Sequence, residues 1–220
     1  MKHFLIAILL AFTASSSYAA SSGRDSLETR PLLMLKTSAM TIVNWRSELS
    51  YADIGAEMRI FKSLTFNADA GFYFQSHWSG VPEYTQGFYY DAGLRHYFDL
   101  PNWDGLYVSP QYRYQRKKSV QELDFNEAGL PYRKLVDVNR NSHFGLIMVG
   151  MNTQYWFDRL YFDWNLGLGF EHRTTDIKGL ADFEWEAVNT GEVEGVKWDD
   201  AAGRILPAYH FELKIGVRIF

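Results

Sequence analysis

The sequence predicts an all-β fold in which eight antiparallel strands form a closed up-and-down barrel. Three observations support this prediction. Apolar and polar residues alternate over several segments, which indicates strands with two unlike faces. Short and long connections alternate between those segments, as they do around an up-and-down barrel. After the N-terminal region, no run of about 18 apolar residues is present that could form a transmembrane helix.

Four segments alternate cleanly and define the sheet. They comprise residues 64–74, 87–98, 160–171 and 208–220. In the first segment, Phe66 and Phe72 share one face, whereas Asn67 and Asp69 share the other. Because side chains alternate between the two faces of a strand, each segment is expected to have one apolar and one polar face.

Four further segments complete the eight strands less regularly. They comprise residues 32–43, 49–61, 106–117 and 144–157. Lys36 lies on one face of the first, and the pattern of the second changes phase near Asp53. Pro110 interrupts the third, and we expect a bulge there because proline cannot donate a ladder hydrogen bond. The fourth is apolar on both faces over part of its length.

The connections fall into two length classes. The short ones lie around residues 62–63, 99–105 and 158–159, and a modest turn covers residues 44–47. The long ones comprise residues 75–86, 119–142 and 174–203. Tight turns on one side and long loops on the other are typical of barrels that cross an outer membrane.

The N-terminus predicts a secretory signal peptide over residues 1–19. Lys2 supplies the positive charge, residues 4–12 form a short apolar core, and Ala19 ends a stretch of small residues suited to cleavage. The apolar core is too short for a spanning helix. Residues 20–220 are then expected to form one barrel domain. The chain has no cysteine, which excludes disulfides and a lipidated cysteine.

The polar faces predict a closed interior. Their charges of both signs are nearly balanced, as a lumen requires, because an unpaired buried charge costs several kcal/mol. The predicted lumen network consists of Glu57, Arg59, Asp69, Asp91, Arg95, Arg113, Asp163, Glu171, Glu212, Lys214 and Arg218. An eight-stranded barrel is narrow enough for side chains to fill it, which favours a plugged interior over a pore. An antiparallel sandwich with one solvated face would alternate in the same way.

The C-terminal KIGVRIF and the signal peptide give the chain a resemblance to small outer-membrane barrels of the OmpA/OmpX type. It is also similar to uncharacterised barrels of this class from Bacteroidota. The resemblance implies a monomer in the outer membrane of a Gram-negative cell envelope. It also implies that the terminal aromatic, Phe220, is read by the barrel-insertion machinery. Phe220 is one position out of phase with Ile219, and a bulge near Gly216 would restore the phase.

Two surface features suggest binding. Arg116, Lys117 and Lys118 stand where the fifth strand is expected to leave the membrane, where they could hold lipopolysaccharide phosphates. A solvated loop base explains them equally simply. The connection 174–203 is acidic and has no Ca²⁺-binding order of ligands, and the sequence predicts no metal or cofactor.

The leading functional prediction is a structural or adhesive role, with recognition through the connections 119–142 and 174–203. The formal charge of −4, without a basic and aromatic pattern, argues against nucleic-acid binding. Two alternatives remain open. His77 and Ser79 have the spacing found in lipid A deacylases of this fold, which suggests a lipid A-modifying enzyme. The other alternative is a narrow channel for small solutes.

Overall fold

The computed structural model describes residues 32–38, 50–74, 85–100, 103, 105–127, 130–155, 159–182, 184 and 203–219. The predicted signal peptide lies outside the described residues. So do His77, Ser79, Phe220 and residues 185–202 of the predicted connection 174–203.

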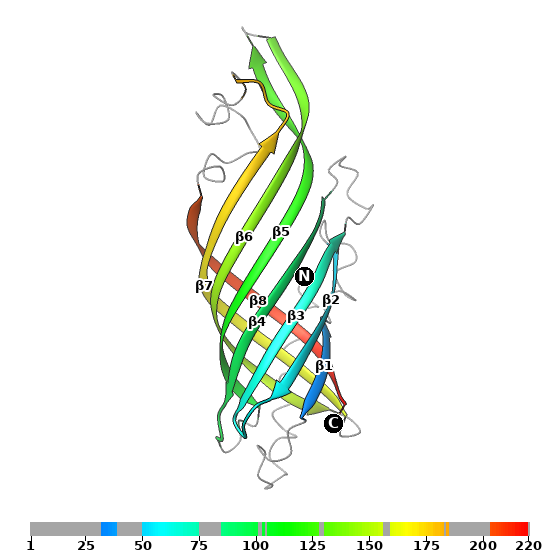
Figure 1. Ribbon diagram of the computed structural model, residues 1–220, viewed down its shortest axis with the longest axis vertical. Helices are drawn as coiled ribbons and strands as arrows, with labels where there is room; N and C mark the ends of the chain where they lie inside the picture. The colour runs from blue at the N-terminus through cyan, green and yellow to red at the C-terminus, as the bar shows by residue number, and fades with distance from the viewer. Residues whose placement is uncertain are drawn as a thin grey trace, which may run out of the picture.

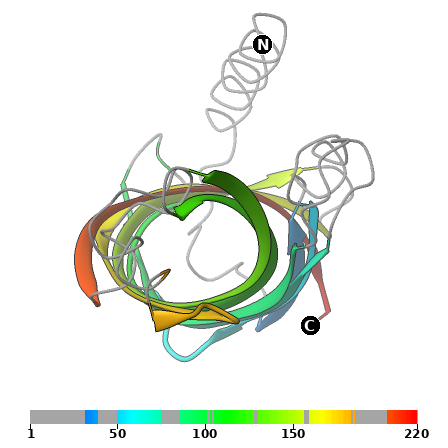
Figure 2. The same cartoon turned by 90° about the horizontal axis from the view of Figure 1, so that it is seen from above.

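The described residues form eight strands in one antiparallel sheet, which confirms the all-β up-and-down fold. The strands are β1 (Leu33–Ser38), β2 (Ser50–Arg59), β3 (Leu64–Phe74), β4 (Thr85–Tyr97), β5 (Leu106–Glu127), β6 (Leu130–Tyr155), β7 (Leu160–Lys178) and β8 (Arg204–Arg218). Each strand pairs with its neighbours in sequence, and β1 also pairs with β8. The ring of hydrogen bonds is therefore closed, and Figure 2 shows it from above.

The strands β5 and β6 are much longer than the sequence suggested. They pair without interruption from Leu106↔Met151 to Glu127↔Leu130. The prediction of a loop over residues 119–142 is therefore wrong. The reason is that inward-facing Leu123, Phe125 and Val136 pack in an apolar cluster, whereas the charged residues between them face outward. This hairpin rises beyond the other strands (Figure 1).

The register contains none of the irregularities that the sequence suggested. The strands β2 and β3 pair evenly past Asp53, which faces inward like Glu57. The pairs on either side of Pro110, Gly93↔Gln111 and His96↔Val108, keep one register, so proline interrupts the β4–β5 ladder without a bulge. Pairing also continues one for one through Gly216, so β8 does not contain the bulge that would restore the phase.

The polarity of the two faces of the sheet is reversed relative to that in a water-soluble globular protein. The buried inward side chains of the lower barrel are mainly polar or charged, whereas large apolar side chains such as Leu168 and Phe170 are 63% and 67% exposed on the outside. The largest buried apolar cluster lies higher, on the inner face of the β5–β6 hairpin and β7. No helix among the described residues is long and apolar enough to cross a membrane.

Glycines allow two close approaches between backbones. Gly105 adopts a φ of 94° before β5 and lies against the Asn152 carbonyl, where a side chain would be both strained and obstructed. A Cβ atom on Gly169 would lie 1.9 Å from the Gly145 carbonyl oxygen, whereas a Cβ atom on Gly145 would meet nothing within 4 Å. The β6–β7 contact therefore depends on Gly169 and tolerates change at Gly145.

We predict that Gly169→Ala lowers the free energy of unfolding by about 1–3 kcal/mol, because β6 and β7 must separate to admit the methyl group. Gly145→Ala is the matched control and is expected to change it by less than about 0.5 kcal/mol. Equilibrium urea unfolding followed by tryptophan fluorescence measures both. Equal effects of the two substitutions would contradict the proposed close contact.

Candidate functional site

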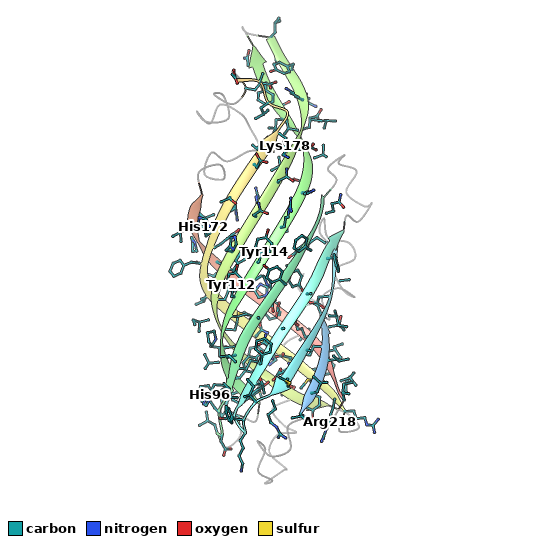
Figure 3. The ribbon with its side chains drawn as sticks, in the orientation of Figure 1. His96, Tyr112, Tyr114, His172, Lys178 and Arg218 are labelled. Carbon is teal, nitrogen blue, oxygen red and sulfur yellow. The ribbon has the colours of Figure 1, made fainter. Side chains whose placement is uncertain are left out.

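Among the described residues, buried polar and charged side chains are concentrated in the barrel interior. Strand alternation turns most of the predicted lumen residues inward and buries them. The buried members are Glu57, Asp69, Asp91, Arg95, Arg113, Asp163, Glu171, Glu212 and Lys214. Arg59 is only partly buried, and Arg218 is exposed at the end of the barrel (Figure 3).

Four charged side chains form the lower part of the network, and we call them the lower array. They are Lys36, Glu57, Arg95 and Asp163, which come from β1, β2, β4 and β7. Lys36 Nζ pairs with Glu57 and lies 2.7 Å from Asp163 Oδ2. Arg95 Nη1 lies 2.9 Å from Glu57 Oε2 and 2.5 Å from Asp163 Oδ2. Each cation thus contacts both carboxylates, and the array connects strands on different sides of the ring.

Tyrosine hydroxyls complete the coordination of the two carboxylates. Tyr97 donates to Glu57 Oε1 at 2.5 Å, and Thr65 donates to the same oxygen at 2.8 Å. Tyr107 donates to Asp163 Oδ1 at 2.6 Å, and its ring lies 4.4 Å from the Arg95 guanidinium carbon. These hydrogen bonds compensate for removing the carboxylates from water, because a buried charge needs its remaining lone pairs satisfied.

A second group, which we call the upper array, lies around Arg113 and Lys214. Arg113 Nη2 lies 2.6 Å from Asp91 Oδ2 and also pairs with Glu212. Lys214 Nζ lies 2.8 Å from Asp69 Oδ1 and 3.1 Å from Glu212 Oε2. Three carboxylates therefore share two cations. His210 lies beside this group, with its Nε2 atom 2.8 Å from Glu212 Oε1.

Sequence reasoning missed three kinds of participant. The predicted network lacks Lys36, although the parity of β1 places this side chain on the inward face. Asp53 was obscured by the supposed phase change, yet it accepts a hydrogen bond from Tyr89 at 2.6 Å. For the buried tyrosines Tyr97 and Tyr107, the only indication in the sequence is that they lie on the polar face of their strands.

The three adjacent basic residues Arg116, Lys117 and Lys118, which we call the basic triplet, do not form one cluster. Lys117 turns inward, where its Nζ atom lies 4.6 Å from the centroid of the Tyr73 ring. Arg116 and Lys118 belong to the opposite, outward face. A single phosphate cannot therefore engage all three side chains from one side of the sheet.

The top of the molecule is a packed platform rather than a bare hairpin. Leu123, Phe125, Val136, Val138 and Ile177 form its apolar cluster. Glu184 joins it to the segment after β7, because it accepts hydrogen bonds from Tyr132 at 2.8 Å, Lys134 at 2.6 Å and the Ala181 amide at 2.5 Å. Burial alone would raise the pKa of Glu184, but these hydrogen bonds, led by that of Lys134, lower it overall.

Among the described residues, no group of histidine and carboxylate side chains could hold a metal ion. Comparison of the chain with known protein families, curated proteins and solved structures found no match. The chemistry of the site therefore has to be inferred from its geometry. That geometry places ion pairs inside the barrel whose side chains are almost fully buried.

We predict that Lys36→Met lowers the free energy of unfolding by about 3–5 kcal/mol, because Glu57 and Asp163 would keep their charges with one cation between them. Adding Asp163→Asn restores the charge balance and should recover part of the loss. Lys178→Met, at an exposed position, is the control and should change the unfolding free energy little. Urea unfolding measures all three, and an unaffected Lys36→Met protein would contradict the role of the lower array.

We further predict that the Ala181 amide loses protection from hydrogen exchange in Glu184→Gln, because the carboxylate that accepts its hydrogen bond is removed. Since the pKa of Glu184 is lowered by folding, its contribution is complete above its ordinary pKa of 4.5 and is lost as the pH falls through the folded value. The protection factor at neutral pH is expected to drop severalfold in Glu184→Gln. It should stay unchanged in the control Asp182→Asn, and a fall in both would point to general loosening.

Proposed function

We propose that the chain is an outer-membrane β-barrel with a plugged lumen, and that it anchors the rigid β5–β6 hairpin and presents it outside the cell. The role is structural or adhesive, with the hairpin platform as the surface that meets a ligand or partner. The observation that carries the proposal is the outward face of the barrel. It is apolar and free of Asp, Glu, Lys and Arg along all eight strands over one band of the described residues.

This band has the dimensions that a bilayer requires. In β7 the outward positions from Leu160 to Phe170 are all apolar, and the next is His172. That span agrees with the about 9–11 residues that a tilted transmembrane strand needs. Figure 3 shows His96 near the lower end of the barrel, with Tyr112, Tyr114 and His172 higher up and Lys178 above them. Amphipathic rings at both limits of the band suit the two membrane interfaces.

The interior supports an anchor better than a pore. The lower array links β1, β2, β4 and β7 through buried ion pairs, and the upper array adds a second charged layer. Ions would have to break these contacts to pass. The hairpin, in contrast, is built for exposure, because β5 and β6 pair beyond Ser119, the last residue of β5 that pairs with β4. Continuous backbone hydrogen bonds make it stiff.

The membrane proposal predicts that the chain, refolded into lipid vesicles, migrates differently on a gel with and without heating. It also predicts no steady conductance in a planar bilayer, because buried ion pairs occupy the lumen. Arg95→Ala, which removes a cation from the lower array, is expected to introduce measurable leak. Steady conductance of the native chain would favour the channel instead, and a changed lipid A mass spectrum would favour the enzyme.

The display role predicts that shortening the hairpin separates anchoring from recognition. Replacing residues 120–137 by an Asn-Gly turn joins Ser119 to Val138, which already face each other in the ladder. The shortened chain should insert as before but lose the adhesion of cells that carry the full-length protein. Substituting the exposed pair Glu122 and Arg133 by serine, which keeps the hairpin length, is the control. Undiminished adhesion by the shortened chain would rule out the hairpin as the recognition surface.

A further inference from the structure

A row of aromatic and imidazole side chains crosses the outer face of the barrel at the upper limit of the apolar band. Tyr114, His143 and His172 are direct cross-strand partners on β5, β6 and β7. The Tyr114 and His143 ring centroids are 5.0 Å apart, and those of His143 and His172 are 6.2 Å apart. Two adjacent imidazoles facing outward therefore stand just above the last lipid-exposed phenylalanine of β7, Phe170.

A tyrosine orients the first imidazole. The Tyr112 hydroxyl lies 2.7 Å from His143 Nδ1. When the phenol donates to Nδ1, the neutral imidazole carries its proton on Nε2. The outer nitrogen of His143 is then a hydrogen-bond donor, and His172 presents a second imidazole on the neighbouring strand.

Arg116 occupies the next outward position above this row. Its cross-strand neighbours are Phe88 on β4 and Asn141 on β6, and Asn141 in turn pairs with Thr174. The Arg116 Nε atom is buried and has no hydrogen-bond partner in the structure. The two rows hold no carboxylate among the described residues, and the first outward carboxylate of β7 above them is Asp176, opposite Asn139. This part of the surface therefore carries the positive charge of Arg116 without a facing carboxylate, and the Nε donor of Arg116 is unpaired.

A notch lies directly below the imidazoles. Gly145 is an outward, exposed position between Tyr112 on β5 and Phe170 on β7. No heavy atom lies within 4 Å of the place where its Cβ would be. Its cross-strand partners Tyr112 and Phe170 carry large rings, so the missing side chain leaves open space between them, which we call the notch.

We propose that this surface is a binding site for a phosphate-bearing membrane lipid. Arg116, His143 and His172 hold the phosphate, and an acyl chain lies in the notch over Gly145. Arginine suits the phosphate because its guanidinium offers paired donors to the oxygens. The depth is also appropriate, because Arg116 and the two imidazoles stand at the end of the apolar band where lipid phosphates lie. The proposal rests on the proposed insertion into a membrane. Unlike the phosphate site predicted from the sequence, which included the inward-facing Lys117, this site consists of residues that share the outward face.

Native mass spectrometry of the refolded chain in detergent tests the site, with lipid A as the probe and dephosphorylated lipid A as its matched counterpart. The native chain is expected to retain one lipid A molecule and to bind the dephosphorylated form at least 10-fold more weakly. Arg116→Gln and His143→Gln should each weaken lipid A binding by about 5- to 10-fold, which is the loss of one charged or neutral hydrogen bond to phosphate. Gly145→Leu should also weaken lipid A binding, because the leucine side chain would fill the notch.

Arg218→Gln is the control, because it removes one exposed positive charge from the opposite end of the barrel. It should change lipid A binding less than twofold. Equal retention of the two lipids, or equal binding by the native chain and the Arg116 and Gly145 variants, would overturn the site. Heat-modifiable migration is measured on the native chain and on every variant. A native chain that does not insert refutes the proposed function, whereas a native chain that inserts but does not bind lipid A refutes only this inference.

Discussion

The structure depends on the charge balance of the lower array. Lys36, Glu57, Arg95 and Asp163 come from four strands that are far apart in the chain, and each cation contacts both carboxylates. Because the outward face of the sheet is apolar, the interior of the barrel holds, among the described residues, only a small buried apolar cluster, formed by Leu146, Met148 and Ala208. Buried ion pairs and tyrosine hydrogen bonds connect the strands across this interior.

The chemistry of the inner face changes along the barrel. Charged layers fill its lower part, whereas Leu123, Phe125 and Val136 continue the same inner face on the β5–β6 hairpin. The outer face changes in the opposite sense, from an apolar band to charged residues such as Glu122 and Asp124. The hairpin is thus built like an ordinary water-exposed structure, and the barrel below it is built inside out. The exchange occurs near Arg116, at the height where we propose the boundary between lipid and water.

Much of this fold could be predicted from the period of the sequence alone. Alternation located four strands cleanly and four less regularly. It also turned residues such as Asp91 and Glu212 inward, because side-chain parity requires no knowledge of distant contacts. It could not identify which cation meets which carboxylate, since Lys36 and Asp163 are brought together only by closure of the ring. The ends of β5 and β6 were missed because their outer charges resemble those of a loop. The basic triplet was misread as one cluster because adjacent positions in a strand point to opposite sides.

The even register of β5 and β6 has a consequence for how the molecule can vary. Between Gln121↔Val136 and Glu127↔Leu130 the ladder contains no shift, and at that height β5 no longer pairs with β4 and β6 no longer pairs with β7. Adding two residues to each strand would preserve the side-chain faces and the turn, and would leave the charged layers below untouched. Each such step lengthens the hairpin by roughly 7 Å. The length of the hairpin can therefore vary between related sequences without any change in the charged layers of the barrel below it.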